Sequence, residues 1–198
     1  MNEISAFVLA GGKSSRLGTD KALLKIHGET LLERAVALST HVTDKVFVVG
    51  EKAKLTGIGN VVEDAYNGCG PLGGIHAALR HSSTDGNLLL AVDMPFVTEK
   101  FLRFLISISQ QFDSVVTVPQ SGGRLQPLCA IYRKVFAEVA EQALQRGKYK
   151  VDPLFDHVST RIIEEKELAA AGFSAEIFEN VNTPDDWEQA QRRISQDV

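Results

Sequence analysis

Glycines and cations gather in the segment Leu9–Lys21, which directly follows an apolar run. Gly11 and Gly12 would let the backbone approach a ligand closely and turn its N–H groups toward phosphate oxygens. Arg16 and Lys21 add cations whose hydrogen bonds to phosphate would be worth about 1.5–3 kcal/mol each. The segment matches neither the Walker A loop nor the dinucleotide fingerprint, because its glycines fall at positions 11, 12 and 18. A plain surface loop is the alternative interpretation, which so many glycines and cations disfavour.

A carboxylate, Asp93, follows the apolar run Leu88–Val92. A buried carboxylate without a partner would be costly, so Asp93 needs a partner or a metal ion. Mg²⁺ takes one or two carboxylates together with phosphate oxygens and waters, and Asp93 suits that role. Alternatively, Asp93 caps the helix that is expected after Thr98. The glycine-rich loop favours the metal role, because both features would lie at the same edge of a sheet.

Two further segments hold polar residues at predicted element ends. Asp64 closes the short strand Val61–Glu63 and precedes a loop, residues 67–75, with several glycines around a proline. Such a loop indicates backbone pressed close to a ligand, although a plain turn fits nearly as well. Asn182 and Thr183 precede the final predicted helix, and either of them could simply be its N-cap.

Composition excludes several classes of protein. A net charge of -4 leaves no basic surface for nucleic acid, so an anionic substrate must be held by a few placed cations and backbone N–H groups. Two distant cysteines and five unpaired histidines indicate reduced thiols and no zinc site. No apolar run approaches ~20 residues, and Glu3 precedes the first short one, so we expect no membrane span and no signal peptide. We therefore expect a cytoplasmic protein.

Strand-length apolar runs alternate with helical patterns through most of the chain, as in stacked βα units. We expect buried parallel strands at Ile4–Ala10, Val46–Val49, Val61–Glu63, Leu88–Val92 and Ser114–Val118, with further strands at Leu128–Tyr132 and Arg161–Glu164. We expect helices near 31–38, 71–79, 98–108, 134–145 and 184–193. The pattern predicts one domain over residues 1–198, an α/β fold whose mostly parallel sheet carries helices on both faces. Ligands of such sheets bind beyond the carboxyl ends of the strands.

Read in order, these segments resemble the molybdenum cofactor guanylyltransferases, the molybdopterin-guanine dinucleotide biosynthesis protein A family of the nucleotidyltransferase superfamily. The segments that carry the resemblance are LAGGKSSRLGTDK (9–21), VVEDA (61–65), GPLGGI (70–75), AVDMPF (91–96), QPLCAIY (126–132) and NVNTPDD (180–186). The resemblance implies a Rossmann-like fold of the nucleotide-diphospho-sugar transferase type. It also implies transfer of GMP from GTP to molybdopterin carrying molybdenum, with release of pyrophosphate and with Mg²⁺ as cofactor.

The resemblance also assigns residues to roles. The implied GTP site comprises Leu9, Ala10, Gly11, Gly12, Lys21, Asp64 and Asp93, with Lys21 on the phosphates and Asp93 also ligating Mg²⁺. Asn180 and Asn182 would help to hold the molybdopterin side. Leu17 stands where the family usually has Met, and Gly50 offers no side chain where some members place an Asn on the nucleotide. Other cofactor-assembly proteins are candidate partners.

The implied reaction needs no general base, because a phosphate nucleophile is already anionic near neutral pH. Catalysis would rest on positioning and on charge neutralisation by Arg16, Lys21 and metal-bound Asp93. One alternative is a cytidylyltransferase that acts on molybdopterin or on a sugar or polyol phosphate; the second loop glycine, Gly12, favours guanine. Another is a catalytically silent nucleotide-binding protein.

Overall fold

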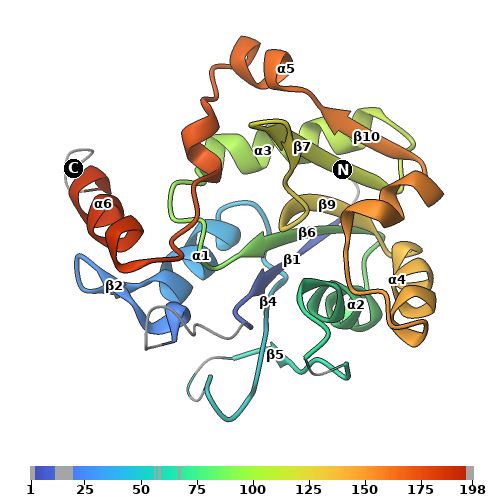
Figure 1. Ribbon diagram of the computed structural model, residues 1–198, viewed down its shortest axis with the longest axis horizontal. Coiled ribbons are helices and arrows are strands. Elements are labelled where there is room, and N and C mark those ends of the chain that lie inside the picture. Colours follow the sequence, from blue (N-terminus) through green and yellow to red (C-terminus); the bar gives the residue numbers. More distant parts are fainter. Residues whose placement is uncertain (1–2, 12–19, 56, 58, 67, 195–198) are drawn as a thin grey trace.

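A computed structural model describes residues 3–11, 20–55, 57, 59–66 and 68–194. The strands of its main sheet are β1 (Ile4–Leu9), β4 (Val46–Val49), β5 (Val61–Val62), β6 (Gly86–Ala91), β7 (Val116–Ser121), β8 (Arg124–Leu125), β9 (Cys129–Arg133) and β10 (Thr160–Ile163). They are arranged in the order β10-β7-β9-β6-β1-β4-β5, with β8 paired to β7 (Figure 1). Two short strands that the sequence did not predict, β2 (Lys25–Ile26) and β3 (Glu29–Thr30), form a separate antiparallel hairpin.

The main sheet is mostly parallel, with one reversed strand in its interior. β1 pairs in parallel with β4 and β6, β4 with β5, and β7 with β10. β9 is inserted between β6 and β7 and runs antiparallel to both. The reason is its short connection: only residues 122–128 separate β7 from β9, whereas a parallel neighbour needs a crossover of about a dozen residues or more.

The helices are α1 (Leu31–Thr40), α2 (Pro71–His81), α3 (Glu99–Gln111), α4 (Phe136–Gln145), α5 (Glu165–Ala170) and α6 (Pro184–Ile194). A polar side chain caps the start of several of them, α1 among them. The Thr30 hydroxyl accepts from the N–H of Glu33, whose carboxylate accepts from the N–H of Thr30 in return. In the part of the chain that is described, no helix combines the length and the apolar character that a membrane crossing demands.

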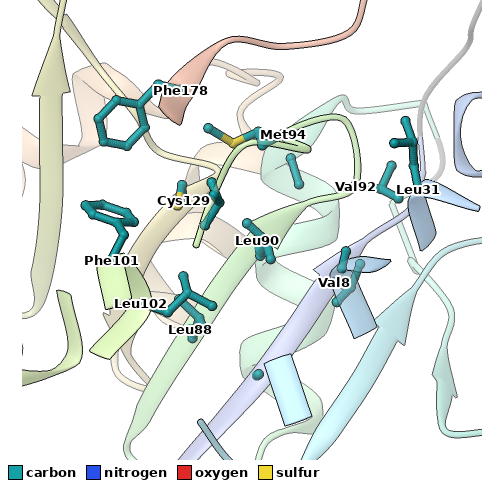
Figure 2. Close-up of a cluster of buried hydrophobic side chains, with 14 of the residues drawn as sticks. Val8, Leu31, Leu88, Leu90, Val92, Met94, Phe101, Leu102, Cys129 and Phe178 are labelled. Atoms are coloured by element: carbon teal, nitrogen blue, oxygen red, sulfur yellow. The ribbon is translucent and has the colours of Figure 1, made fainter. Parts of the chain in front are cut away.

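Side chains of the central strands alternate between two apolar cores. Ala6 and Val8 belong to a core with α1, α3, α5 and α6, whereas Phe7 and Leu9 belong to a core with α2 and α4. Figure 2 shows part of the first core, in which Leu88 and Leu90 of β6 lie near Leu102 of α3 and Val8 lies on the neighbouring strand. Helices therefore cover both faces, which confirms the prediction and holds the carboxyl ends of the strands in a fixed arrangement.

Candidate active site

The carboxyl ends of four adjacent strands meet at one edge of the sheet. The N–H of Val92 donates to the carbonyl of Leu9 at 3.1 Å, and the N–H of Ala10 donates to the carbonyl of Val49 at 2.9 Å. Gly11 follows with open space beside its Cα. The predicted pocket residues Leu9, Ala10 and Gly11 are thus brought to the same edge as the segment that carries Asp93.

Three side chains from distant parts of the sequence converge at this edge. The Lys21 Nζ lies 3.0 Å from Asp93 Oδ2 and 2.5 Å from Asn182 Oδ1. The side chains of Lys21 and Asp93 are 19% and 20% exposed, so the ion pair is partly shielded from water. A single ammonium group therefore joins the segment after the glycine-rich loop to the end of β6 and to the segment before α6. The three side chains of Lys21, Asp93 and Asn182 form the Lys21 cluster.

The backbone of Lys21 is held from both sides. Asp20 caps a 3-10 turn, Lys21–Leu23, by accepting from the N–H of Ala22 at 3.1 Å. Ala22 is 1% exposed and packs in the first apolar core. The position of the Lys21 backbone is thus fixed by core packing, while its four-carbon side chain reaches Asp93 and Asn182.

Asp93 is held between buried neighbours at the end of β6. Val92 and Met94 are both buried, and Figure 2 shows them within the first core. The carbonyl of Asp93 accepts from the N–H of Val181 at 2.9 Å, which ties the end of β6 to the C-terminal segment. Thr98 caps α3 by accepting from the N–H of Phe101 at 3.3 Å, so the alternative in which Asp93 is the cap is wrong.

Asp186 orders the segment that carries Asn182. Its Oδ2 accepts from the N–H groups of Asn182 at 2.9 Å and Thr183 at 2.8 Å, and the Thr183 hydroxyl accepts from the N–H of Asp186 at 3.2 Å. The hydrogen bond from the Asn182 N–H is the main factor that lowers the pKa of Asp186, and the Lys21 ammonium also contributes. Thr183 is therefore the cap of α6, whereas the Asn182 side chain faces Lys21.

The sequence did not single out Asp186 as a residue of the site. The spacing of Thr183 and Asp186, three residues apart just before a helical pattern, is the signal of a capping box and could have identified it.

Asn180 lies on the same segment but lines a cavity beside the cluster. The cavity has a volume of about 190 Å³ and is bounded by Phe96, Glu179, Asn180, Val181, Asp186, Gln189 and Ala190. The guanidinium of Arg193 lies over the Phe96 ring, 4.2 Å from its centre. The two predicted acceptor-side residues thus have different surroundings: Asn182 contacts Lys21, and Asn180 faces a polar cavity.

Asp64 is placed by α2 instead of by the Lys21 cluster. Its Oδ1 accepts from the N–H of Tyr66 at 2.7 Å. Its Oδ2 lies 2.3 Å from where a Cβ on Gly73 would stand, so this carboxylate occupies the space that the glycine leaves open. The helix begins after Gly70, whose φ of 68° suits glycine. The carboxylate therefore packs on the first turn of α2.

Gly12 and Arg16, both predicted at the phosphates, lie outside the described residues. Gly50 packs beside the predicted pocket: a Cβ there would stand 2.9 Å from Leu55 Cδ1 and 3.7 Å from the Cβ of Ala10. A side chain at position 50 would therefore require the end of the Leu55 side chain to shift, and the Gly50 backbone lies next to Ala10.

The donor set suits a hard divalent cation that arrives with phosphate. A carboxylate oxygen of Asp93 and an amide oxygen of Asn182 already surround one cation, the Lys21 ammonium. Within the described ranges, no three His, Cys, Asp or Glu side chains gather tightly enough to hold a metal unaided. Mg²⁺ commonly takes only one or two protein oxygens and completes its shell with phosphate and water, so Asp93 and Asn182 fit it.

The fold and this site define an α/β nucleotidyltransferase. Residues 6–160 match the model of the MobA-like NTP transferase domain family. The probable molybdenum cofactor guanylyltransferase of Pelotomaculum thermopropionicum is 36% identical over 96% of this chain and 93% of its own length. The chain therefore belongs to the MobA-like NTP transferases and, among them, to the molybdenum cofactor guanylyltransferase family, which confirms the resemblance drawn from the sequence.

Solved structures agree with this assignment. Molybdopterin-guanine dinucleotide biosynthesis protein A from Archaeoglobus fulgidus superposes with a TM-score of 0.86 at 25% identity, over 97% of this chain and 99% of that chain. CMP:2-keto-3-deoxy-manno-octonic acid synthetase shares the fold, with a TM-score of 0.77 at 13% identity over 99% and 100% of the two chains. The predicted nucleotide-diphospho-sugar transferase fold is confirmed.

Proposed function

We propose that this protein transfers GMP from GTP to the terminal phosphate of molybdopterin carrying molybdenum and releases pyrophosphate. The names of its relatives support this activity. The observation that carries it is the position of the Lys21 ammonium, held between Asp93 at the strand ends and Asn182 in the C-terminal segment. One cation thus stands where the implied nucleotide and acceptor sides meet. We further propose that residues 1–198 act as one nucleotidyltransferase domain, in the cytoplasm.

In this reaction an oxygen of the acceptor phosphate forms a bond to the α-phosphorus of GTP. The bond from the α-phosphorus to the bridging oxygen breaks, and that oxygen leaves with pyrophosphate. The attacking phosphate is already anionic near neutral pH, so no side chain has to remove a proton. Lys21 and Arg16 neutralise the charge that develops on the leaving pyrophosphate.

The remaining residues position the two substrates. Leu9, Ala10, Gly11 and Gly12 approach the nucleotide through their backbone, and Asp64 contacts it from the side of α2. Asn180 and Asn182 hold the molybdopterin. Asp93 and Asn182 would hold Mg²⁺, which when bound neutralises phosphate charge and orients the phosphates for in-line displacement.

The direct test is release of pyrophosphate from each of the four NTPs, with and without molybdopterin. We expect release from GTP that depends on the presence of molybdopterin and of Mg²⁺. Preferential release from CTP, with molybdopterin or a sugar or polyol phosphate, would establish a cytidylyltransferase instead. GTP binding in a calorimeter with no pyrophosphate release would establish a silent nucleotide-binding protein.

A further inference from the structure

The Lys21 ammonium fills the point on which the oxygen ligands of the cluster converge. Its Nζ is 3.0 Å from Asp93 Oδ2 and 2.5 Å from Asn182 Oδ1, both within hydrogen-bond distance. Four-fifths of each charged side chain is shielded from solvent, so this charge is screened less than in an exposed ion pair. The Lys21 ammonium thus occupies the position beside Asp93 in which a bound metal ion would lie.

A divalent ion at the same oxygens would meet this ammonium at close range. Repulsion between like charges only a few ångströms apart is strong where water is partly excluded. Replacing the ammonium would also break two charge-assisted hydrogen bonds that it makes. Metal binding at Asp93 therefore requires that the Lys21 head group leave first.

The local structure allows the head group to leave while the backbone stays. The 3-10 turn that starts at Lys21 is fixed by the Asp20 cap and by the buried Ala22. The lysine side chain carries a compact charge on a flexible stem of four carbons, so its ammonium group can move to another anion while the backbone keeps its fold. The phosphates of a nucleotide beside the glycine-rich loop would provide such an anion.

We propose that Lys21 occupies the cation position of Asp93 and Asn182 while no nucleotide is bound, and that the phosphates of the arriving nucleotide draw it away. Its departure opens the Asp93 carboxylate to the metal and the Asn182 amide to the metal or the acceptor. The nucleotide therefore binds before the acceptor, and the metal enters with the nucleotide and not ahead of it. The proposal rests on the proposed function for the identity of the anion that moves Lys21.

The test is a titration of the nucleotide-free protein with Mn²⁺, followed by the electron paramagnetic resonance signal of the free ion. We expect Lys21→Ala and Lys21→Met to bind Mn²⁺ at least about tenfold more tightly than the wild type, which corresponds to about 1.4 kcal/mol. Lys25→Ala is the matched control, because it removes an exposed lysine of the neighbouring hairpin and changes the net charge equally. We expect it to bind Mn²⁺ as the wild type does.

A second arm adds Asp93→Asn to each Lys21 variant, and we expect the gain in Mn²⁺ affinity to disappear. The proposal is overturned if neither Lys21 variant gains about tenfold, or if the gain survives the loss of the Asp93 carboxylate. Lys21→Met keeps the apolar stem, so the test stands even if Lys21→Ala fails to fold by circular dichroism. The titration uses neither GTP nor acceptor, so its failure is distinct from a failure of GMP transfer.

Discussion

Two parts of the same sheet edge are built in different ways. On the side of α2, the Asp64 carboxylate is placed by shape, because it fills the space that Gly73 leaves without a side chain. On the other side, Lys21 is placed by charge, through polar contacts to residues 72 and 161 positions away in the sequence. The Asp64 side should therefore be sensitive to substitutions that add side-chain volume, and the Lys21 side to substitutions that remove a charge. This difference can be tested.

The largest effect is expected from removing charge at Asp93. Asp93→Asn should lower turnover by about 100-fold or more, because a group that neutralises charge in the transition state is lost. The fold should persist, since the neighbours Val92 and Met94 keep their buried contacts. Pyrophosphate release across a range of Mg²⁺ concentrations measures the loss.

The control for this variant is Asp85→Asn at the opposite end of β6. The Asp85 carboxylate pairs with the Arg133 guanidinium at 3.2 Å, and its side chain is 59% exposed. We expect unchanged turnover and a stability change within about 0.5 kcal/mol. Full turnover of Asp93→Asn at limiting Mg²⁺ would contradict the role of Asp93 in charge neutralisation.

A smaller effect is expected from adding one methyl group to α2. In Gly73→Ala the new Cβ would stand 2.3 Å from Asp64 Oδ2, so the carboxylate must rotate away. Loss of one hydrogen bond to a charged group, about 1.5–3 kcal/mol, should weaken GTP binding by about tenfold or more in calorimetry. Because both changes remove the same contact, Gly73→Ala should cost nothing further in an Asp64→Ala background.

The adjacent glycine provides the matched control. A Cβ on Gly74 would stand 3.5 Å from Leu9 Cδ2 and 3.8 Å from Val49 Cγ1, both of which are ordinary contacts. Gly74→Ala should therefore leave GTP affinity unchanged and raise stability by roughly 0.5–1 kcal/mol, because alanine favours the helix. Equal losses of GTP affinity in both variants would show that the Asp64 contact is not what matters.

The smallest effect is expected from the pH response of His76 in α2. His76 is 6% exposed, and neither of its ring nitrogens has a hydrogen-bond partner among the residues that the structure describes. Burial lowers the pKa of His76 below its usual value near 6.5. The unfolded chain therefore takes up the proton first, so stability is full above about pH 6.5 and falls as the pH drops toward the folded-state pKa.

His76→Phe removes this titration and keeps an aromatic ring against Tyr66, whose ring centre lies 5.1 Å away. Denaturant unfolding at about pH 7.5 and about pH 5.5 should show a smaller loss of stability in the variant than in the wild type. His157→Gln, which removes an exposed histidine, serves as the control and should lose stability as the wild type does. Identical losses in wild type and His76→Phe would rule out this role of His76.

The sequence predicts the fold correctly where local pattern and burial agree. The apolar runs of β1, β4 and β6 were predicted because strands covered on both faces need apolar side chains throughout. It did not predict the β2–β3 hairpin or the short helix α5, since such short elements carry little periodic pattern. The antiparallel direction of β9 was not predicted either, because direction depends on which strands pair.

In the candidate site, too, some features could be predicted from the sequence and others could not. The glycine-rich loop, Lys21 and Asp93 stood out in the sequence because phosphate binding needs unusual residue types close together. The sequence could not decide whether Asn182 or Thr183 caps α6, because both residue types are good N-caps. The structure decides for Thr183, since the Asp186 carboxylate holds the backbone and leaves the Asn182 side chain facing Lys21.

The alternation of strands and helices can be predicted from the sequence, since it follows from local burial and conformational preference, and the residue types at the strand ends can be read from it directly. The contact of Lys21 with both Asp93 and Asn182 is visible only in the tertiary structure. That contact depends on strand order and on the path of the C-terminal segment, which are fixed by packing between residues far apart in the chain. Local preference carries no information about such pairs.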